Sequence, residues 1–382
     1  MVTLRFVSYS FLCAVLFVIL SGAYRAVLPF GDEPDFDVRA QQLVLGEHSI
    51  WSPYNWFSSL YSQMQYSSFC KIEATATSPS ADIDEMSCTE QFEQRVIRWL
   101  LMLFLCIPLI ISSVFYLFKE ERADDFERNC VLATSLVFPG VIYYLGVFSI
   151  EQLTLITSLL CFVFWRHKTI LFCLISIVLL LDFGNGIVVL LFVAMLIFYS
   201  YIHKQFGLKF CVYMMFGQVV LCYVIGYSIL GYTQGFAPLA EKSQSMYRLL
   251  ESGGLVEKYP VILRPIITYM TLIFFTPAYL KAPIVYAIFG CACLFMGRRI
   301  YRTLQEKKVE QYEKIVLQSM VAITLIVSFV FFFPNYANGK YYVFLIPFII
   351  YPLFFVVHRI RLLSFFLTMN VLILIHVMYF SL

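Results

Sequence analysis

The sequence predicts an all-α polytopic membrane protein with about 11 transmembrane helices and two large loops on its outer face. The 382 residues are 61% hydrophobic and only 13% charged, whereas soluble domains are about 45–50% apolar and about 25% charged. Apolar runs of roughly 18 residues, the length that crosses a bilayer as a helix, recur along the whole chain. We therefore interpret residues 1–382 as a single integral membrane domain.

Charged residues divide the apolar runs and so define the predicted spans. The first run also resembles a signal peptide, because a basic start precedes an apolar core, but that core is long enough to span and we take it as an uncleaved helix. The predicted spans are 5–24, 95–118, 129–149, 151–166, 169–182, 185–202, 208–231, 282–297, 315–333, 341–357 and 362–380.

The distribution of Lys and Arg predicts the orientation. With a cytoplasmic N-terminus, 16 of the 27 basic residues fall on one face, including every tight cluster, as the positive-inside rule requires. Residues 261–280 are also apolar enough to span, but a span there would move Arg298 to the outer face. Because Pro265 and Pro277 weaken a straight helix, we expect an interfacial or re-entrant segment, with a count of 12 spans as the alternative.

Two long segments, 25–94 and 232–281, form the predicted outer loops. In the first loop, Trp51, Tyr54 and Trp56 have the spacing of an amphipathic helix at the headgroup level. Cys70 and Cys88 flank a polar stretch of the same loop, and a disulfide between them on the oxidising side of the membrane is a hypothesis.

An acidic motif follows the first span directly. Gly31 and Pro34 bracket Asp32 and Glu33 on a constrained turn, and a carboxylate held at a membrane surface can act as a general base. The alternative is an ordinary solvated loop. Three further charged residues are expected to shape this turn: Asp35, Asp37 and Arg39.

Two more carboxylates lie at predicted outer turns. Glu151 is the acidic residue in the hairpin 138–160; it is either a functional membrane-edge carboxylate or the start of a helix. Asp182 precedes Gly184 and Asn185, which is turn chemistry and favours a structural role.

Cations on the outer face are candidates for binding phosphate. Arg248 and Arg264 lie in the second loop, and Lys340 opens a late span among tyrosines. Arginine offers phosphate a bidentate fork, while snorkelling and interfacial anchoring are the alternatives. No nucleotide-binding or zinc motif occurs, and nothing in the sequence indicates a nucleic acid partner.

The chain resembles the GT-C class of membrane glycosyltransferases in six features. These are the single first span, the acidic motif Gly31-Asp32-Glu33, the juxtamembrane segment 35–65, the hairpin with Pro139 and Glu151, the loop after span seven and the late stretch 340–348. The resemblance implies that Asp32 or Glu33 is the catalytic base. It also implies that Arg264, with Lys340 or Arg248, binds the phosphate of a polyprenyl-linked sugar. Some members bind a divalent metal at the acidic motif; no other cofactor is implied. This chain is short for the class and lacks a soluble C-terminal domain.

The function that we expect is transfer of a sugar from a polyprenyl-phosphate-linked donor to a lipid-linked or cell-envelope glycan acceptor. The expected location is a bacterial inner membrane, with a cytoplasmic N-terminus and a periplasmic active site among membrane lipids. The alternatives are an O-antigen-type repeat-unit polymerase and a lipid or glycan transporter. Spans six, seven, nine and eleven carry almost no charge, which disfavours ion-coupled transport.

Overall fold

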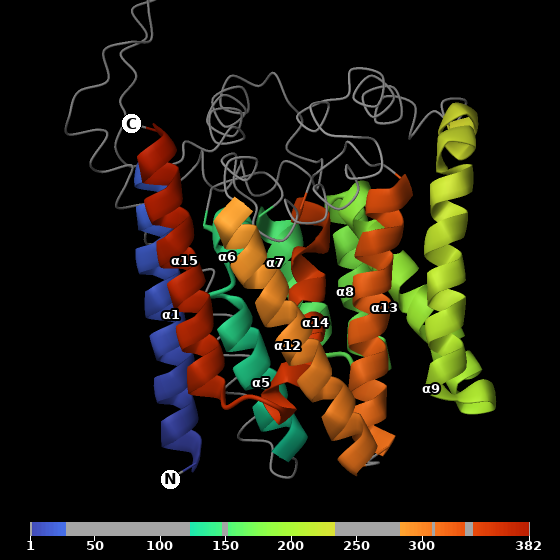
Figure 1. Cartoon of the computed structure of the whole chain (residues 1–382), viewed down its shortest axis with the longest axis horizontal. Coiled ribbons are helices and arrows are strands. Elements are labelled where there is room, and N and C mark those ends of the chain that lie inside the picture. The colour runs from blue at the N-terminus through green and yellow to red at the C-terminus, as the bar shows by residue number, and fades with distance from the viewer. Residues whose placement is uncertain are drawn as a thin grey trace, which may run out of the picture.

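The structure, a computed structural model, describes residues 2–27, 123–146, 152–233, 283–307, 310–332 and 339–381. This part of the chain is almost entirely helical and contains no strand (Figure 1). Its elements are α1 (Val2–Val27), α5 (Ala123–Ser135), α6 (Pro139–Leu145), α7 (Gln152–Val163), α8 (Lys168–Leu181), α9 (Phe183–Thr233), α12 (Pro283–Lys307), α13 (Glu310–Phe332), α14 (Ile346–Ile350), α15 (Arg359–Ser381) and the 3₁₀ helices η5 (Gly339–Leu345) and η6 (Tyr351–Phe355).

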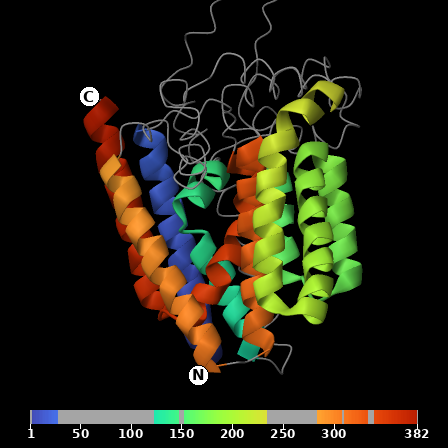
Figure 2. The ribbon, with the colours of Figure 1, turned by 45° about the vertical axis from the view of Figure 1, so that its right-hand side comes forward.

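The helices form a bundle with two ends (Figures 1 and 2). We call the end at which α1 begins the proximal end and the end at which α1 finishes the distal end. Helices α1 and α15 pack together along one edge of the bundle, and α9 lies at the opposite edge. The chain therefore starts at the proximal end, and α15 finishes at the distal end.

Three described helices are long and apolar enough to cross a membrane: Phe183–Val224, Gln311–Phe331 and Arg359–Tyr379. This confirms the membrane class that the composition predicts. The first of the three contains a reversal at Gly207, whose φ of 78° and ψ of 174° interrupt the helix. The two arms of α9 therefore run antiparallel (Figure 2), as the two predicted spans 185–202 and 208–231 require.

The centre of the bundle is a broken helix rather than a straight span. We predicted one span over 341–357, but the structure has η5, α14 and η6 in succession. Pro347 and Pro352 lie in the first turns of α14 and η6, because proline lacks an N–H and tends to open a new helical segment.

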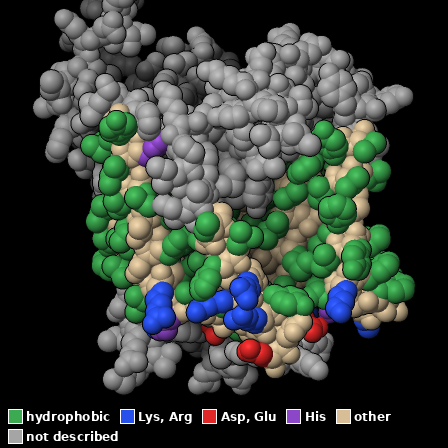
Figure 3. Space-filling view, viewed as in Figure 1, with side chains coloured by type: hydrophobic (Ala, Val, Ile, Leu, Met, Phe, Trp, Pro, Cys, Tyr) green, Lys and Arg blue, Asp and Glu red, His purple; other side chains and the backbone are tan. Residues whose placement is uncertain are grey.

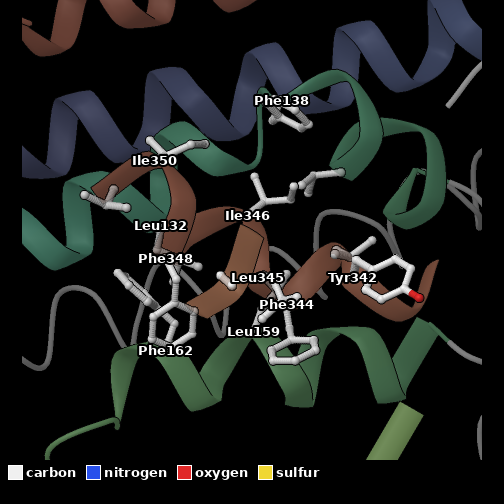
Figure 4. Packing of buried hydrophobic residues seen from close by; sticks show 14 of the residues in the cluster. Leu132, Phe138, Leu159, Phe162, Tyr342, Phe344, Leu345, Ile346, Phe348 and Ile350 are labelled. Atoms are coloured by element: carbon white, nitrogen blue, oxygen red, sulfur yellow. The ribbon is translucent and has the colours of Figure 1, made fainter. Parts of the chain in front are cut away.

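Aromatic side chains fill the space around this broken segment (Figure 4). The rings of Phe162 on α7 and Phe348 on α14 meet edge to face at 4.9 Å, and Phe192 on α9 lies 4.7 Å from Phe348. Edge-to-face pairs of this kind are favourable beyond the area that they bury. They fix the irregular backbone in the middle of the protein.

A second break divides the predicted span 129–149. Helix α5 ends at Ser135, and Phe138 adopts an extended conformation before Pro139 opens α6. The carbonyl oxygen of Val137 accepts a hydrogen bond of 2.8 Å from the Asn370 side chain of α15. A neighbouring helix thus supplies the donor that the interrupted helix lacks.

Candidate functional site

Lys340 is the one predicted site residue that the structure describes. The others lie outside the described residues: Asp32, Glu33, Asp35, Asp37, Arg39, Trp51, Tyr54, Trp56, Cys70, Cys88, Glu151, Arg248 and Arg264. The structure tests neither the proposed disulfide nor the proposed base.

Five of the described residues that border these segments share one end of the bundle. Val27 precedes the acidic motif, Gly146 and Gln152 flank the position of Glu151, and Thr233 and Pro283 flank the second loop. All five lie at the distal end, as does Gly339 at the start of η5 (Figures 1 and 2). We therefore take the distal end as the candidate site.

Tyrosine side chains surround the start of η5 at this end. The Gly339 N–H donates a hydrogen bond of 3.1 Å to the hydroxyl oxygen of Tyr144, at the end of α6. The Tyr144 ring lies edge to face with Tyr143 at 5.1 Å. Lys340 is half-buried, with Nζ at 5.8 Å from the centre of the Tyr341 ring. A cation is thus held against an aromatic face, on a backbone that is hydrogen-bonded to α6.

A close approach between α1 and α6 fixes the position of this tyrosine pair. A Cβ atom at Gly146 would collide with the Ser21 side chain and with the carbonyl oxygen of Ile142. Only glycine lets the end of α6 lie this close to α1. The sequence marks the position with a glycine but does not show which helix approaches it.

Asp182 has the structural role that its sequence context favours. Its carboxylate accepts hydrogen bonds from the backbone N–H of Gly184 at 2.8 Å and from the Asn185 side chain at 2.7 Å. These bonds cap the first turn of α9.

Sequence reasoning missed a buried polar network between α1, α15 and the break between α5 and α6. Asn370 is 0% exposed, accepts a hydrogen bond of 3.0 Å from the Tyr24 hydroxyl and donates to the carbonyl of Val137. An asparagine inside an apolar run was the available signal, because buried amides need partners. The partners, more than 200 residues away, could not be identified from one sequence.

Arg128 lies inside the bundle, which the count of basic residues in the sequence does not reveal. We counted it among the cytoplasmic basic residues, but it is only 5% exposed. Its Nη1 donates a hydrogen bond of 3.0 Å to the carbonyl of Phe162, in the last turn of α7. Its guanidinium lies 5.2 Å from the Phe162 ring and 5.6 Å from the Tyr351 ring. Arg128 therefore caps the C-terminal end of α7 instead of facing water.

Among the described residues, no group of three or more His, Cys, Asp or Glu side chains is placed to hold a metal ion. Comparison of the chain with protein-family models, curated proteins and solved structures finds no match.

Proposed function

We propose that the chain is a membrane glycosyltransferase that moves a sugar from a polyprenyl-phosphate-linked donor to a lipid-linked or cell-envelope glycan acceptor. One observation carries this proposal: Val27, which precedes the acidic motif, and the described residues that flank Glu151 and the second loop lie at the distal end, where η5, the helix of Lys340, also begins. A transferase of this kind needs a carboxylate and phosphate-binding cations on the same side of the membrane.

The proposed topology has 11 spans with the distal end on the outer face. Val27 lies at the distal end and Ala123 at the proximal end, which is what the proposed span 95–118 requires. Thr233 and Pro283 both lie at the distal end, whereas a single additional span at 261–280 would need them at opposite ends. We place the proximal end in the cytoplasm of a bacterial cell and the site in the periplasm.

The basic side chains support this orientation. Lys and Arg gather toward the proximal end in Figure 3. The last turns of α12 and the first turn of α15 contribute Arg298, Arg302 and Arg361. An excess of Lys and Arg marks the cytoplasmic side of most membrane proteins.

The proposed reaction is a single displacement. The acceptor hydroxyl oxygen attacks the anomeric carbon of the donor, and the bond from that carbon to the phosphate oxygen breaks. Asp32 or Glu33 takes the hydroxyl proton, which typically contributes about 10²–10⁴-fold to the rate. The polyprenyl phosphate leaves with the bonding electron pair, and Arg264, Lys340 and Arg248 stabilise its charge.

A deletion strain of the source organism tests the proposal. Mass spectrometry of its lipid-linked glycans should show an accumulated intermediate that lacks one sugar. Accumulation of complete but unpolymerised repeat units would refute transfer of a single sugar and favour the repeat-unit polymerase. An unchanged glycan profile would contradict both activities.

Complementation with variants tests the assignment of the base. Asp32→Asn and Glu33→Gln should be compared with Glu306→Gln, an exposed carboxylate at the proximal end of α12. We expect at least one of the first two variants to fail to restore the glycan, whereas the Glu306 variant restores it fully. Full rescue by both acidic-motif variants would rule out a base at either position.

A further inference from the structure

One face of α12 has the pattern of an anionic lipid site. Arg298, Arg299 and Arg302 lie within about 100° of one another around the helix axis, at about 100° per residue. All three side chains are exposed. Within the described residues, neither Arg298 nor Arg302 forms an ion pair with a carboxylate. Three guanidinium groups thus share one face, and the exposed Glu306, one turn past Arg302 on the same face, forms no ion pair with them.

The same face is apolar on its distal side. Leu294 and Phe295, one turn before the arginines, are 77% and 59% exposed. Because a helix repeats every 3.6 residues, these side chains lie directly above Arg298 and Arg299. The face therefore passes from exposed apolar groups to exposed cations within two turns, which matches the passage from acyl chain to phosphate in a phospholipid.

The conformation of Arg299 also favours an anion site. Its guanidinium lies over the Phe295 ring, with Cζ 4.9 Å from the ring centre. The charged group is thus folded back toward the apolar part of the helix, whereas a snorkelling arginine extends toward water. A charge at this depth is stabilised when an anion lies beside it.

The surroundings of this face have the composition that is typical of a headgroup region. Tyr301 is exposed, and its hydroxyl oxygen accepts a hydrogen bond of 2.7 Å from Gln305. Tyrosine is enriched at membrane interfaces. In Figure 3 the Lys and Arg side chains lie next to the apolar surface, and the Asp and Glu side chains in view lie beyond them, toward the proximal end.

We propose that this face of α12 binds the phosphate and acyl chains of an anionic glycerophospholipid from the leaflet at the proximal end. The guanidinium groups of Arg298, Arg299 and Arg302 bind the phosphate, and Leu294 and Phe295 contact an acyl chain. The inference does not depend on the proposed enzymatic activity.

Native mass spectrometry of the full-length protein in detergent tests the proposal with phosphatidylglycerol as the probe. The variant Arg298→Gln/Arg302→Gln is compared with Lys204→Gln/Lys209→Gln, which removes two exposed charges from the proximal turn of α9. We expect the arginine variant to bind phosphatidylglycerol at least about tenfold more weakly, the equivalent of one charge-assisted hydrogen bond. The lysine variant should bind like the wild type.

Further measurements make the result decisive. Circular dichroism and size-exclusion profiles of each variant must match those of the wild type. An Arg298→Lys/Arg302→Lys variant keeps the charges in place, and its loss of phosphatidylglycerol binding should be intermediate. Equal binding of phosphatidylcholine, or equal loss in the lysine variant, would overturn the proposal. Displacement by millimolar inorganic phosphate would assign the site to free phosphate, and displacement by equimolar polyprenyl phosphate would assign it to the polyprenyl lipid.

Discussion

Individual polar residues complete the backbone at two places where a helix of the bundle is interrupted or ends. Water is absent from a membrane interior, so an interrupted helix must find donors and acceptors within the protein. Asn370 supplies a donor to Val137 at the break between α5 and α6, and Arg128 supplies one to Phe162 at the end of α7. These two side chains satisfy main-chain carbonyl groups at a helix break and at a helix end.

Replacing Asn370 by Ala should lower the free energy of unfolding by about 1–3 kcal/mol, because the Val137 carbonyl and the Tyr24 hydroxyl both lose their partner. Tyr24→Phe should cost less, about 0.6 kcal/mol, the average for a hydrogen bond inside a membrane protein. Unfolding by SDS titration in mixed micelles measures both values. Thr368→Ala, an exposed position of the same helix, serves as the control, and equal effects at positions 368 and 370 would contradict the network.

Lys340 should be required for transfer, since its half-buried ammonium group is the described cation of the proposed phosphate site. Lys340→Met is expected to lower the rate with a polyprenyl-linked donor by about 10²-fold, the effect of removing one electrostatic contact from a transition state. The purified enzyme and a radiolabelled donor give the rate. Lys209→Met, on the exposed proximal turn of α9, should keep full activity; if both variants lose activity equally, the loss does not report on the site.

At the level of elements, hydropathy predicted where the apolar part of each described helix lies but not always where the helix ends. The span predicted over 282–297 belongs to α12, which continues to Lys307, and α13 begins five residues before its predicted span. Helical hydrogen bonds continue past the membrane boundary because charged residues such as Arg and Glu also favour helices.

The interruptions were harder to predict than the spans. Pro139, Pro347 and Pro352 each signal a new segment, but a proline inside an apolar run is equally consistent with a kinked helix. Whether the helix breaks or only kinks depends on a hydrogen-bond donor or an aromatic ring from a distant element, such as Asn370 or Phe162. Such pairings are not visible in a single sequence.

The reversal within α9 depends on Gly207. Its φ of 78° lies in the region that side chains other than glycine rarely adopt, while a Cβ atom there would meet nothing within 4 Å. Gly207→Ala should therefore destabilise the fold by about 1–3 kcal/mol through backbone strain alone. Gly217 is equally open but helical, so Gly217→Ala should stabilise it by about 0.5–1 kcal/mol. Thermal unfolding followed by circular dichroism distinguishes the two, and effects of the same sign would refute this explanation.

For the whole molecule, the sequence predicted two loops on one face, and the described ends Val27, Thr233 and Pro283 lie at the distal end. That inference required only the alternation of apolar runs and the position of basic residues, both of which are local. The pairing of Tyr144 with Gly339 and the approach of Gly146 to Ser21 depend on three-dimensional packing, so they became visible only in the structure.

The two ends of the chain should lie on opposite sides of the membrane. Helix α1 begins at the proximal end and α15 finishes at the distal end, so we expect an odd number of crossings. Alkaline phosphatase, which is active only outside the cytoplasm, should be active when fused after Leu382, and green fluorescent protein at that position should be dark. A fusion after Lys307, at the proximal end of α12, should give the reverse pattern. Identical patterns at the two positions would place Lys307 and Leu382 on the same side of the membrane. The chain between them would then cross the membrane an even number of times, and both the 11-span topology and the periplasmic site would have to be abandoned.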